Sequence, residues 1–288
     1  MDIVLDFDGT ITRHDTIATL AAHAISKNGG AAAAADWDHI IKAYTLDHAR
    51  YVAGYSPAAA ERTTPAQELA FLNGLRALEQ ASLDRVSDSG LFRDLAPDDL
   101  ARLGECAAVR DGGGRVEIRR GFAELRDGLS RRGRIAVVSA NWSADFIRGC
   151  CGGGGGLDVV AANLVEFPTG RVRGVVPGGD GELVLTARDK YRALEAVVRR
   201  WGRRPGEVVY VGDSGTDLEC LLACRGIVIA DDGEGTLLET LRRLGFEVRH
   251  VAECGTDFRL AWAKDFKEIL DSGILGGPVA TVAPEGMD

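Results

Sequence analysis

The stretch Val4-Leu5-Asp6-Phe7-Asp8-Gly9-Thr10 decides the fold of this chain, because apolar residues lead directly into two carboxylates and a glycine. Asp6 and Asp8 stand two residues apart, so an extended backbone presents both side chains on the same side. A buried strand has no packing reason to end in paired acids, since unpaired charge is costly to bury. The pair suits a hard cation such as Mg²⁺, and it also offers a nucleophile and a proton donor. The alternative is a surface turn that happens to be acidic.

Two later apolar runs also end in polar residues. Ile135–Val138 leads into Ser139–Asn141, and Val208–Val211 leads into Gly212–Asp217. Continuous apolar runs rich in β-branched residues are typical of buried parallel strands. In open α/β sheets the functional site lies at the carboxyl ends of such strands. The sequence therefore predicts a site where three strands end, with Lys190 at the start of a helical pattern between the second and third runs.

These segments resemble, in order, the signatures of the haloacid dehalogenase-like (HAD) superfamily. The four signature segments are Asp6–Thr10, Ser139, Lys190 and Gly212–Asp217. Each is short, but four in the right order, each at an expected strand end or helix start, form a strong signal. The chain also looks like the phosphoserine phosphatase-like branch of that superfamily. This second likeness comes from a candidate hairpin at 163–172 with the apolar run 183–185, and from the stretch 8–16 that follows the first strand.

The resemblance implies an α/β fold, in which a Rossmann-like parallel sheet is sandwiched between helices and a helical C1 cap is inserted after the first strand. Residues 14–115 show helical patterns, and the glycine run 112–114 suits a linker at the end of this block. We therefore expect a helical cap domain at 14–115 and a HAD core domain formed by 1–13 and 116–288.

Two local patterns make further predictions. Thr64-Pro65 is expected to begin a helix, with the threonine as N-cap and the proline at the first helical position. Residues 261–270 are expected to form one amphipathic helix.

The resemblance also implies a reaction, the hydrolysis of a phosphomonoester through an aspartyl-phosphate. Asp6 would attack phosphorus, and Asp8 would protonate the leaving alkoxide and later deprotonate water. Lys190 would supply positive charge in the transition state. The phosphoryl group would be bound by Ser139, Ala140 and Gly9.

By the same resemblance, Mg²⁺ is the expected cofactor. Its ligands would be Asp6, Asp213 and the backbone carbonyl of Asp8. Asp217 would lie behind these ligands and orient Lys190 or a metal-bound water.

Asp15 is the candidate for substrate recognition. It stands where phosphoserine phosphatases carry a glutamate that holds the substrate amine, and the shorter aspartate puts specificity for serine in question. The alternative is that Asp15 caps a helix that starts at Thr16.

The presence of Asp8 favours phosphate chemistry, because the dehalogenases of the superfamily lack this second aspartate. We expect a Mg²⁺-dependent phosphatase of a small phosphorylated metabolite, with the cap closing over the site. One alternative is a phosphotransferase or mutase, which would need water excluded from the phosphoenzyme. Another is a non-catalytic HAD-like protein with a binding or regulatory role.

Composition limits the partners. The chain of 288 residues has a formal net charge of -9, which argues against nucleic acid as a partner. No apolar run approaches the length of a membrane span, so no membrane partner is expected. The first strand begins at Asp2 or Ile3, so we expect no signal or transit peptide ahead of it and a cytoplasmic protein. A monomer and a homodimer are both compatible with the sequence.

Overall fold

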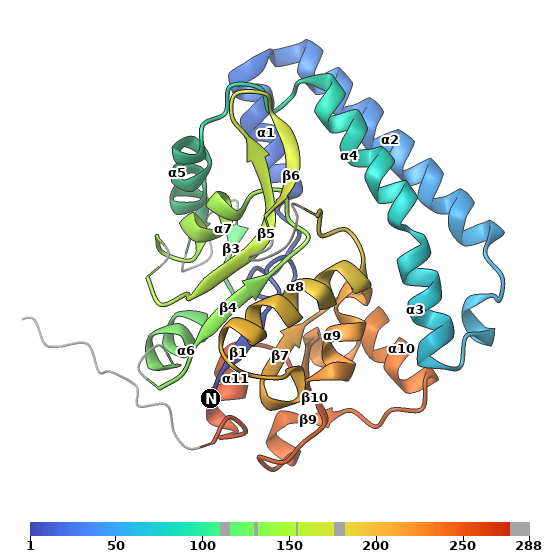
Figure 1. The fold of residues 1–288 in the computed structure, drawn as a ribbon, viewed down its shortest axis with the longest axis vertical. Coiled ribbons are helices and arrows are strands. Elements are labelled where there is room, and N and C mark those ends of the chain that lie inside the picture. The colour runs from blue at the N-terminus through green and yellow to red at the C-terminus, as the bar shows by residue number, and fades with distance from the viewer. Residues whose placement is uncertain (110–115, 130–131, 154, 176–181, 277–288) are drawn as a thin grey trace, which may run out of the picture.

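The computed structural model describes residues 1–109, 116–129, 132–153, 155–175 and 182–276. Within these residues, an eight-stranded sheet forms the centre of the fold (Figure 1). The strands in spatial order are β6 (Arg171–Val175), β5 (Val159–Glu166), β4 (Ile135–Val138), β1 (Ile3–Leu5), β7 (Val209–Gly212), β8 (Arg225–Ile229), β10 (Leu260–Ala263) and β9 (Arg249–His250). Neighbouring strands are parallel, except that β5 and β6 form an antiparallel hairpin.

The first strand lies at the centre of this sheet. Ile3 of β1 lies opposite Ile135 of β4 and Val209 of β7, so the three runs singled out in the sequence are adjacent strands. All three residues of β1 are fully buried. A strand covered on both faces can be apolar throughout, which explains why these runs show no alternation. The predicted parallel α/β sheet is confirmed.

Helices cover both faces of the sheet. Ile3 and Leu5 belong to one apolar core and Val4 to the other, because successive side chains of a strand point to opposite faces. The first core is covered by α6 (Phe122–Leu129), α7 (Ala144–Cys150) and α11 (Phe266–Asp271). The second is covered by α8 (Ala187–Arg200), α9 (Leu218–Ala223) and α10 (Thr236–Arg243).

Short 3₁₀ turns connect other parts of the described chain. They are η1 (Ala59–Glu61), η2 (Pro205–Glu207), η3 (Gly215–Asp217), η4 (Asp231–Gly233) and η5 (Val251–Glu253).

A block of helices follows β1. Its members are α1 (Ile17–Asn28), α2 (Gly30–Gly54), α3 (Pro65–Gly74), α4 (Arg76–Ser89) and α5 (Pro97–Ala107). α2 packs along α4, and these two helices with α3 form an arm beside the sheet (Figure 1). α5 packs on α7 of the core instead, and Leu20 of α1 joins the same apolar core as Ile3. The short parallel pair β2 (Ala108–Val109) and β3 (Val116–Glu117) closes the block.

The boundaries of the cap and core domains stay a prediction, and the glycine run 112–114 lies outside the described residues. The arm formed by α2, α3 and α4 falls within the segment 14–115 that the sequence assigned to the cap.

The predicted helix start at Thr64-Pro65 is confirmed. Thr64 Oγ1 accepts a hydrogen bond from the backbone N–H of Gln67, and Pro65 is the first residue of α3. The proline has no N–H to satisfy at a position where the helix supplies no acceptor.

The prediction of one helix over 261–270 is wrong. Leu260–Ala263 forms strand β10, which pairs in parallel with β8, and the helix α11 begins only at Phe266. Asp265 separates the two elements, since its carboxylate accepts the backbone N–H of Glu268 at 2.9 Å as a helix N-cap. Pairing with a buried neighbouring strand overrides the local helical pattern at Ala261 and Trp262.

The predicted hairpin is present as β5 and β6, with Asn163 opposite Gly174. The apolar run 183–185 is not a strand. It lies against the hairpin, because the Asn163 side chain donates to Val184 O at 3.0 Å and accepts from Val184 N at 2.9 Å.

Among the described residues, no helix combines the length and the apolar character that crossing a membrane requires.

Candidate active site

Asp6 continues the central strand into the site. Its backbone N–H donates to Val211 O at 2.9 Å, so the residue is still held by the sheet where its side chain enters the site. One carboxylate oxygen accepts the N–H of Phe7 at 2.7 Å, and the other lies 2.9 Å from Lys190 Nζ. Asp6 is 4% exposed. The carboxylate is thus fixed in orientation by its own backbone and by one cation.

Lys190 reaches this carboxylate from the first turn of α8. The helix begins there because Thr186 and Asp189 form a reciprocal capping box. The ammonium group donates to Asp217 at 2.8 Å and to Thr216 Oγ1 at 3.1 Å as well as facing Asp6. Burial alone would lower the pKa of Lys190, but the carboxylates of Asp217 and Asp6 hold it above its ordinary value. Lys190 is therefore a fixed positive charge at neutral pH.

Asp217 has hydrogen-bond donors on both of its carboxylate oxygens. One oxygen accepts from Lys190 and, at 2.6 Å, from the hydroxyl of Tyr210. The other accepts the backbone N–H groups of Asp213 at 3.1 Å and Ser214 at 3.0 Å. Burial would raise the pKa of Asp217, but Lys190 lowers it below the usual range. This carboxylate holds both Lys190 and the loop after β7 in place.

Asp213 lies on that loop, facing the loop that follows Asp6. Thr10 Oγ1 donates to Asp213 at 2.7 Å. Gly9 has a φ of +73°, and a Cβ at this position would lie 2.2 Å from the Asp213 carboxylate. Glycine is required there for its backbone conformation and for the close approach of the two loops.

Three carboxylates form a candidate metal site. Oxygen atoms of Asp6, Asp213 and Asp217 lie within 4.8 Å of one another. Lys190 pairs with two of them, whereas Asp213 has no ion-pair partner among the described residues. Burial and the charge of Asp217 raise the pKa of Asp213 to about 7. Oxygen ligands and a half-buried carboxylate without an ion-pair partner in the described residues fit Mg²⁺, with Asp6 and Asp213 as the carboxylates that can offer it lone pairs.

Asp8 occupies the opposite wall of the site. One of its oxygens accepts from the backbone N–H and the hydroxyl of Thr16, at 2.9 and 2.7 Å, and the other accepts from Asn141 Nδ2 at 2.7 Å. Burial and the nearby charge of Asp15 raise the pKa of Asp8 to about 6. This carboxyl group can therefore hold a proton close to neutral pH, unlike an ordinary aspartate.

Ser139 and Ala140 follow β4 at the same edge of the sheet. The N–H of Ser139 donates to Ala161 O at 3.0 Å, and its hydroxyl oxygen accepts the N–H of Asn141 at 3.2 Å. The hydroxyl proton of Ser139 has no acceptor among the described residues, and both Ser139 and Ala140 line the cavity.

Two residues without a role in the sequence analysis support these loops. Asn141 bonds Asp8 and also donates to Thr16 Oγ1 at 3.0 Å, so it links the loops after β1 and β4. Asn141 stands two residues after Ser139 at the end of a predicted strand, and this position was the feature of the sequence from which its role could have been predicted. Arg119, which is 8% exposed, donates to Gly9 O at 3.2 and 3.0 Å and holds that loop from behind. A lone arginine carried no such signal in the sequence.

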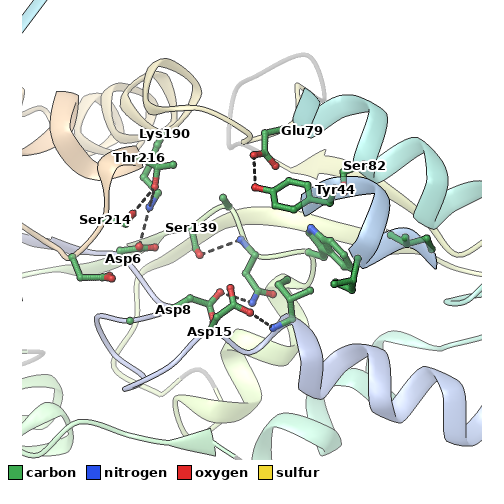
Figure 2. A pocket seen from close by; sticks show the side chains of 18 of the residues that line it. Asp6, Asp8, Asp15, Tyr44, Glu79, Ser82, Ser139, Lys190, Ser214 and Thr216 are labelled. Atoms are coloured by element: carbon green, nitrogen blue, oxygen red, sulfur yellow. Dashed lines mark hydrogen bonds and ion pairs between the residues drawn. The ribbon is translucent and has the colours of Figure 1, made fainter. Parts of the chain in front are cut away.

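A cavity of about 420 Å³ joins these groups to the helical arm. On the core side it is lined by Asp6, Asp8, Gly9, Ser139, Asn141, Lys190 and Asp213, and on the arm side by Trp37, Ile40, Ile41, Tyr44, Glu79 and Ser82. Figure 2 shows Tyr44, Glu79 and Ser82 across the cavity from Asp6 and Lys190. Every predicted site residue except Asp217, which lies behind Lys190, lines this cavity.

Asp15 lies at the junction of the two sides. Its carboxylate accepts the backbone N–H of Ile17, the first residue of α1, at 2.8 Å, although the N-cap position itself belongs to Thr16. Asp15 is exposed to solvent and also lines the cavity. The two alternatives for Asp15 therefore do not exclude each other.

Comparison with known proteins points to one family. A family model described as haloacid dehalogenase-like hydrolase matches residues 3–222. The CTO1 family protein C17G9.12c of Schizosaccharomyces pombe is 30% identical over 234 residues, covering 76% of this chain and 77% of that protein. The phosphoserine phosphatase of Archaeoglobus fulgidus is 32% identical over 106 residues, which is 36% of this chain and 28% of that protein.

A solved structure is similar over almost the whole chain. It is a phospho-aspartyl intermediate analogue of phosphoserine phosphatase, with a TM-score of 0.52 at 20% identity, and the match covers 94% of this chain and 97% of that one. At this level of identity the likeness shows the fold alone.

Proposed function

This chain belongs to the haloacid dehalogenase-like hydrolases, and on that premise we propose that it is a Mg²⁺-dependent phosphatase of a small phosphorylated metabolite. The observation that carries the proposal is the pairing of two unlike carboxyl groups on one cavity. Asp6 faces the ammonium group of Lys190 at 2.9 Å. Burial and the charges of Asp217 and Asp213 raise the pKa of Asp6, whereas Lys190 lowers it. Asp8 has a pKa raised to about 6 and forms no ion pair within the described residues. One carboxylate suited to attack and one carboxyl group suited to proton transfer are what phosphoester hydrolysis through a covalent intermediate needs.

In the first half of the reaction, Asp6 attacks phosphorus and the bond to the leaving oxygen breaks. The proton of Asp8 passes to that oxygen, so the alcohol leaves neutral and Asp8 becomes a carboxylate. In the second half, Asp8 takes a proton from water, the resulting hydroxide attacks the aspartyl-phosphate, and Asp6 is released with inorganic phosphate. Asn141 and Thr16 hold Asp8 in one orientation through both halves, since both of its oxygens are hydrogen-bonded.

Charge compensation is the second requirement. Lys190 remains positive and contacts the nucleophile, so it stabilises negative charge that spreads over the phosphoryl oxygens. The hydroxyl proton of Ser139 has no acceptor among the described residues, so this hydroxyl can donate a hydrogen bond to one of the phosphoryl oxygens. Asp6, Asp213 and the carbonyl of Asp8 would hold Mg²⁺, which when bound offsets the repulsion between Asp6 and an anionic substrate.

Hydrolysis of 4-nitrophenyl phosphate tests the proposal. We expect turnover that requires Mg²⁺, is lost on chelation, and is abolished in Asp6→Asn, which preserves shape and removes the nucleophile's charge. Asp257→Asn is the matched control, because Asp257 is exposed and does not line the cavity. Near-normal turnover in Asp6→Asn would overturn the covalent mechanism. Release of less inorganic phosphate than nitrophenol, with an added alcohol becoming phosphorylated, would indicate a phosphotransferase instead.

A further inference from the structure

We propose that the leaving group of the substrate carries a cationic nitrogen and no second anionic group. This inference rests on the proposed phosphatase function and concerns the arm side of the same cavity. The residues that carry it, called here the cap recess, are Asp15, Trp37, Tyr44, Glu79, Ser82 and Trp142.

Within the described part of the chain, the two acidic groups of the cap recess, Asp15 and Glu79, form no ion pair, and the ring of His48 is the basic group that acts on Glu79. Glu79 accepts a hydrogen bond from the hydroxyl of Tyr44 at 2.9 Å with one oxygen, and its other oxygen accepts none from the described residues. Asp15 likewise uses one oxygen on Ile17 N, while the residue lines the cavity. Burial raises the pKa of the half-buried Glu79, against the lowering effects of the hydrogen bond from Tyr44 and of the nearby His48. Burial also raises the pKa of Asp15, although this residue keeps contact with solvent.

The basic side chain that lines the cavity, Lys190, is already paired with carboxylates on the core side. Among the described residues that line the cavity, Lys190 is the only one with a basic side chain, and it lies between Asp6 and Asp217. The ring of His48 stacks on Tyr44 with centroids 6.0 Å apart, on α2 and outside the lining. A carboxylate or second phosphate on the leaving group would therefore meet Glu79 and Asp15, with no further basic side chain among the described residues of the lining.

Ser82 is an independent sign of a polar ligand. It lies on α4, is 8% exposed, and its hydroxyl has no hydrogen-bond partner among the described residues, yet the residue lines the cavity. The hydroxyl keeps its hydrogen-bonding capacity at the wall of the cavity, where a polar group of a ligand can meet it. Together with the free oxygens of Glu79 and Asp15, it offers acceptors to the N–H groups of a protonated amine.

Aromatic rings form the rest of the recess. Trp37 of the arm meets Trp142 of the core edge-to-face with centroids 6.1 Å apart, and Phe92 also packs edge-to-face against Trp142 at 5.8 Å. Ring faces attract a cation through their quadrupole, most strongly for tryptophan. A recess with aromatic walls and two carboxylates thus suits a positively charged, weakly hydrated group.

This chemistry argues against phosphoserine itself. Its leaving group, serine, carries an α-ammonium group that the recess would accept and an α-carboxylate that it would repel. The leaving group that fits best is a short alcohol that ends in an amine or an alkylated ammonium.

The test compares esters that differ in one charge. The first pair is 2-aminoethyl phosphate against propyl phosphate, and the second is 2-(trimethylammonio)ethyl phosphate against 3,3-dimethylbutyl phosphate. We expect kcat/KM to favour the cationic member of at least one pair by about tenfold or more. L-phosphoserine should be a poorer substrate than 2-aminoethyl phosphate by a similar factor. Equal rates within both pairs, or a preference for phosphoserine, would overturn the inference.

Variants assign the preference to the recess. Glu79→Gln keeps an acceptor for Tyr44 and removes the charge, so the preference for the cation should fall by about tenfold. Asp84→Asn on the same helix is the matched control, since Asp84 is exposed and does not line the cavity, and the preference should be unchanged. A preference for the cation that survives in both Glu79→Gln and Asp15→Asn would overturn the assignment to the carboxylates of the recess.

A binding measurement separates failure of this inference from failure of the phosphatase proposal. Choline and 3,3-dimethylbutanol have the same shape and differ in charge, and neither has a phosphate. Quenching of tryptophan fluorescence should show tighter binding of choline by the wild type but not by Glu79→Gln. Selective choline binding without hydrolysis of any ester would contradict the phosphatase proposal and support cation binding by the recess. Hydrolysis of 4-nitrophenyl phosphate without selectivity for cations would support the phosphatase proposal and contradict cation binding by the recess.

Discussion

The ammonium group of Lys190 lies 2.9 Å from the carboxylate of Asp6, in a place where neither side chain meets bulk solvent. Both charges are shielded from water. Lys190 is stabilised there by Asp6 and Asp217, whereas Asp6 is stabilised by Lys190 against the like charge of Asp217. The pair therefore links the stability of the fold to the chemistry of the site. This link makes the effects of substitutions in the site predictable in sign.

Lys190→Met should lose activity and stability together. The substitution leaves Asp6 and Asp217 buried without their cation, which is expected to lower the free energy of unfolding by about 3–5 kcal/mol. Urea unfolding and 4-nitrophenyl phosphate turnover measure the two effects. Lys267→Met is the control, because Lys267 pairs with Asp271 at the surface. Wild-type stability in Lys190→Met would show that the buried pair does not hold the loops together.

Asp213→Asn should raise the Mg²⁺ concentration needed for half-maximal activity by at least about tenfold, because a charged ligand of a hard cation becomes neutral. Titration of activity with MgCl₂ measures this change. Thr10→Val removes the 2.7 Å hydrogen bond to Asp213 and keeps its charge, so it should give a smaller rise. A Mg²⁺ titration of Asp213→Asn that superimposes on the wild type would remove Asp213 from the metal site.

Gly9→Ala should disrupt the site, although Gly9 has no side chain that could take part in the reaction. The added Cβ would lie 2.2 Å from the Asp213 carboxylate, and the φ of +73° is strained for alanine by about 1–2 kcal/mol. We expect a higher Mg²⁺ requirement and a lower melting temperature. Gly245→Ala is a control for the strain alone, because Gly245 has a φ of +84° and an added methyl group there would have no atom within 4 Å. If both variants behave alike, the contact with Asp213 is unimportant.

The two roles of Asp15 should separate by substitution. Asp15→Asn keeps an acceptor for Ile17 N, so the melting temperature should hold while the preference for cationic esters falls. Asp15→Ala also loses the cap, which should cost about 1 kcal/mol of stability. Thermal unfolding and the ester pairs measure the two effects. An unchanged preference for cations in both variants would leave Asp15 as a helix cap alone.

A second prediction of stability concerns the far end of the arm. Glu68 of α3 accepts from Arg62 Nε and from Arg243 of α10, each at 2.8 Å, and so ties the arm to the core. Burial would raise the pKa of Glu68, but the two arginines lower it below its ordinary value. A carboxyl group with a lowered folded-state pKa stabilises the fold above its unfolded-state pKa, and this contribution is lost as the pH falls through the folded-state value.

Glu68→Gln should therefore be less stable than the wild type near pH 7, and the difference should shrink below about pH 4. Urea unfolding at about pH 7, 5, 4 and 3 measures the difference across this window. Glu61→Gln is a control in the neighbouring turn, where Glu61 is exposed. A difference that stays constant across this pH range would rule out the ion pairs as its cause.

Local patterns in the sequence were enough to predict the central sheet and the strand ends at which the candidate site lies. The runs at Ile3, Ile135 and Val209 are apolar because both faces of each strand are covered, and a short local pattern records that burial. The polar residues that end these runs must then meet at one edge, since parallel strands share their carboxyl end. The start of α3 at Thr64-Pro65 was also predictable, because capping is a local interaction.

Which groups complete the candidate site depends on packing between parts of the chain that are distant in sequence. Whether 261–270 becomes a helix or a strand depends on β8, which lies far away in the sequence and offers a sheet edge to Leu260–Ala263. Asn141 gains its role from Asp8, 133 positions away, and Arg119 gains its role from Gly9. The cap recess exists because the arm brings Trp37 against Trp142 of the core. Such contacts depend on how the elements pack in space, and residues so distant in the chain leave no periodic trace of that packing in the sequence.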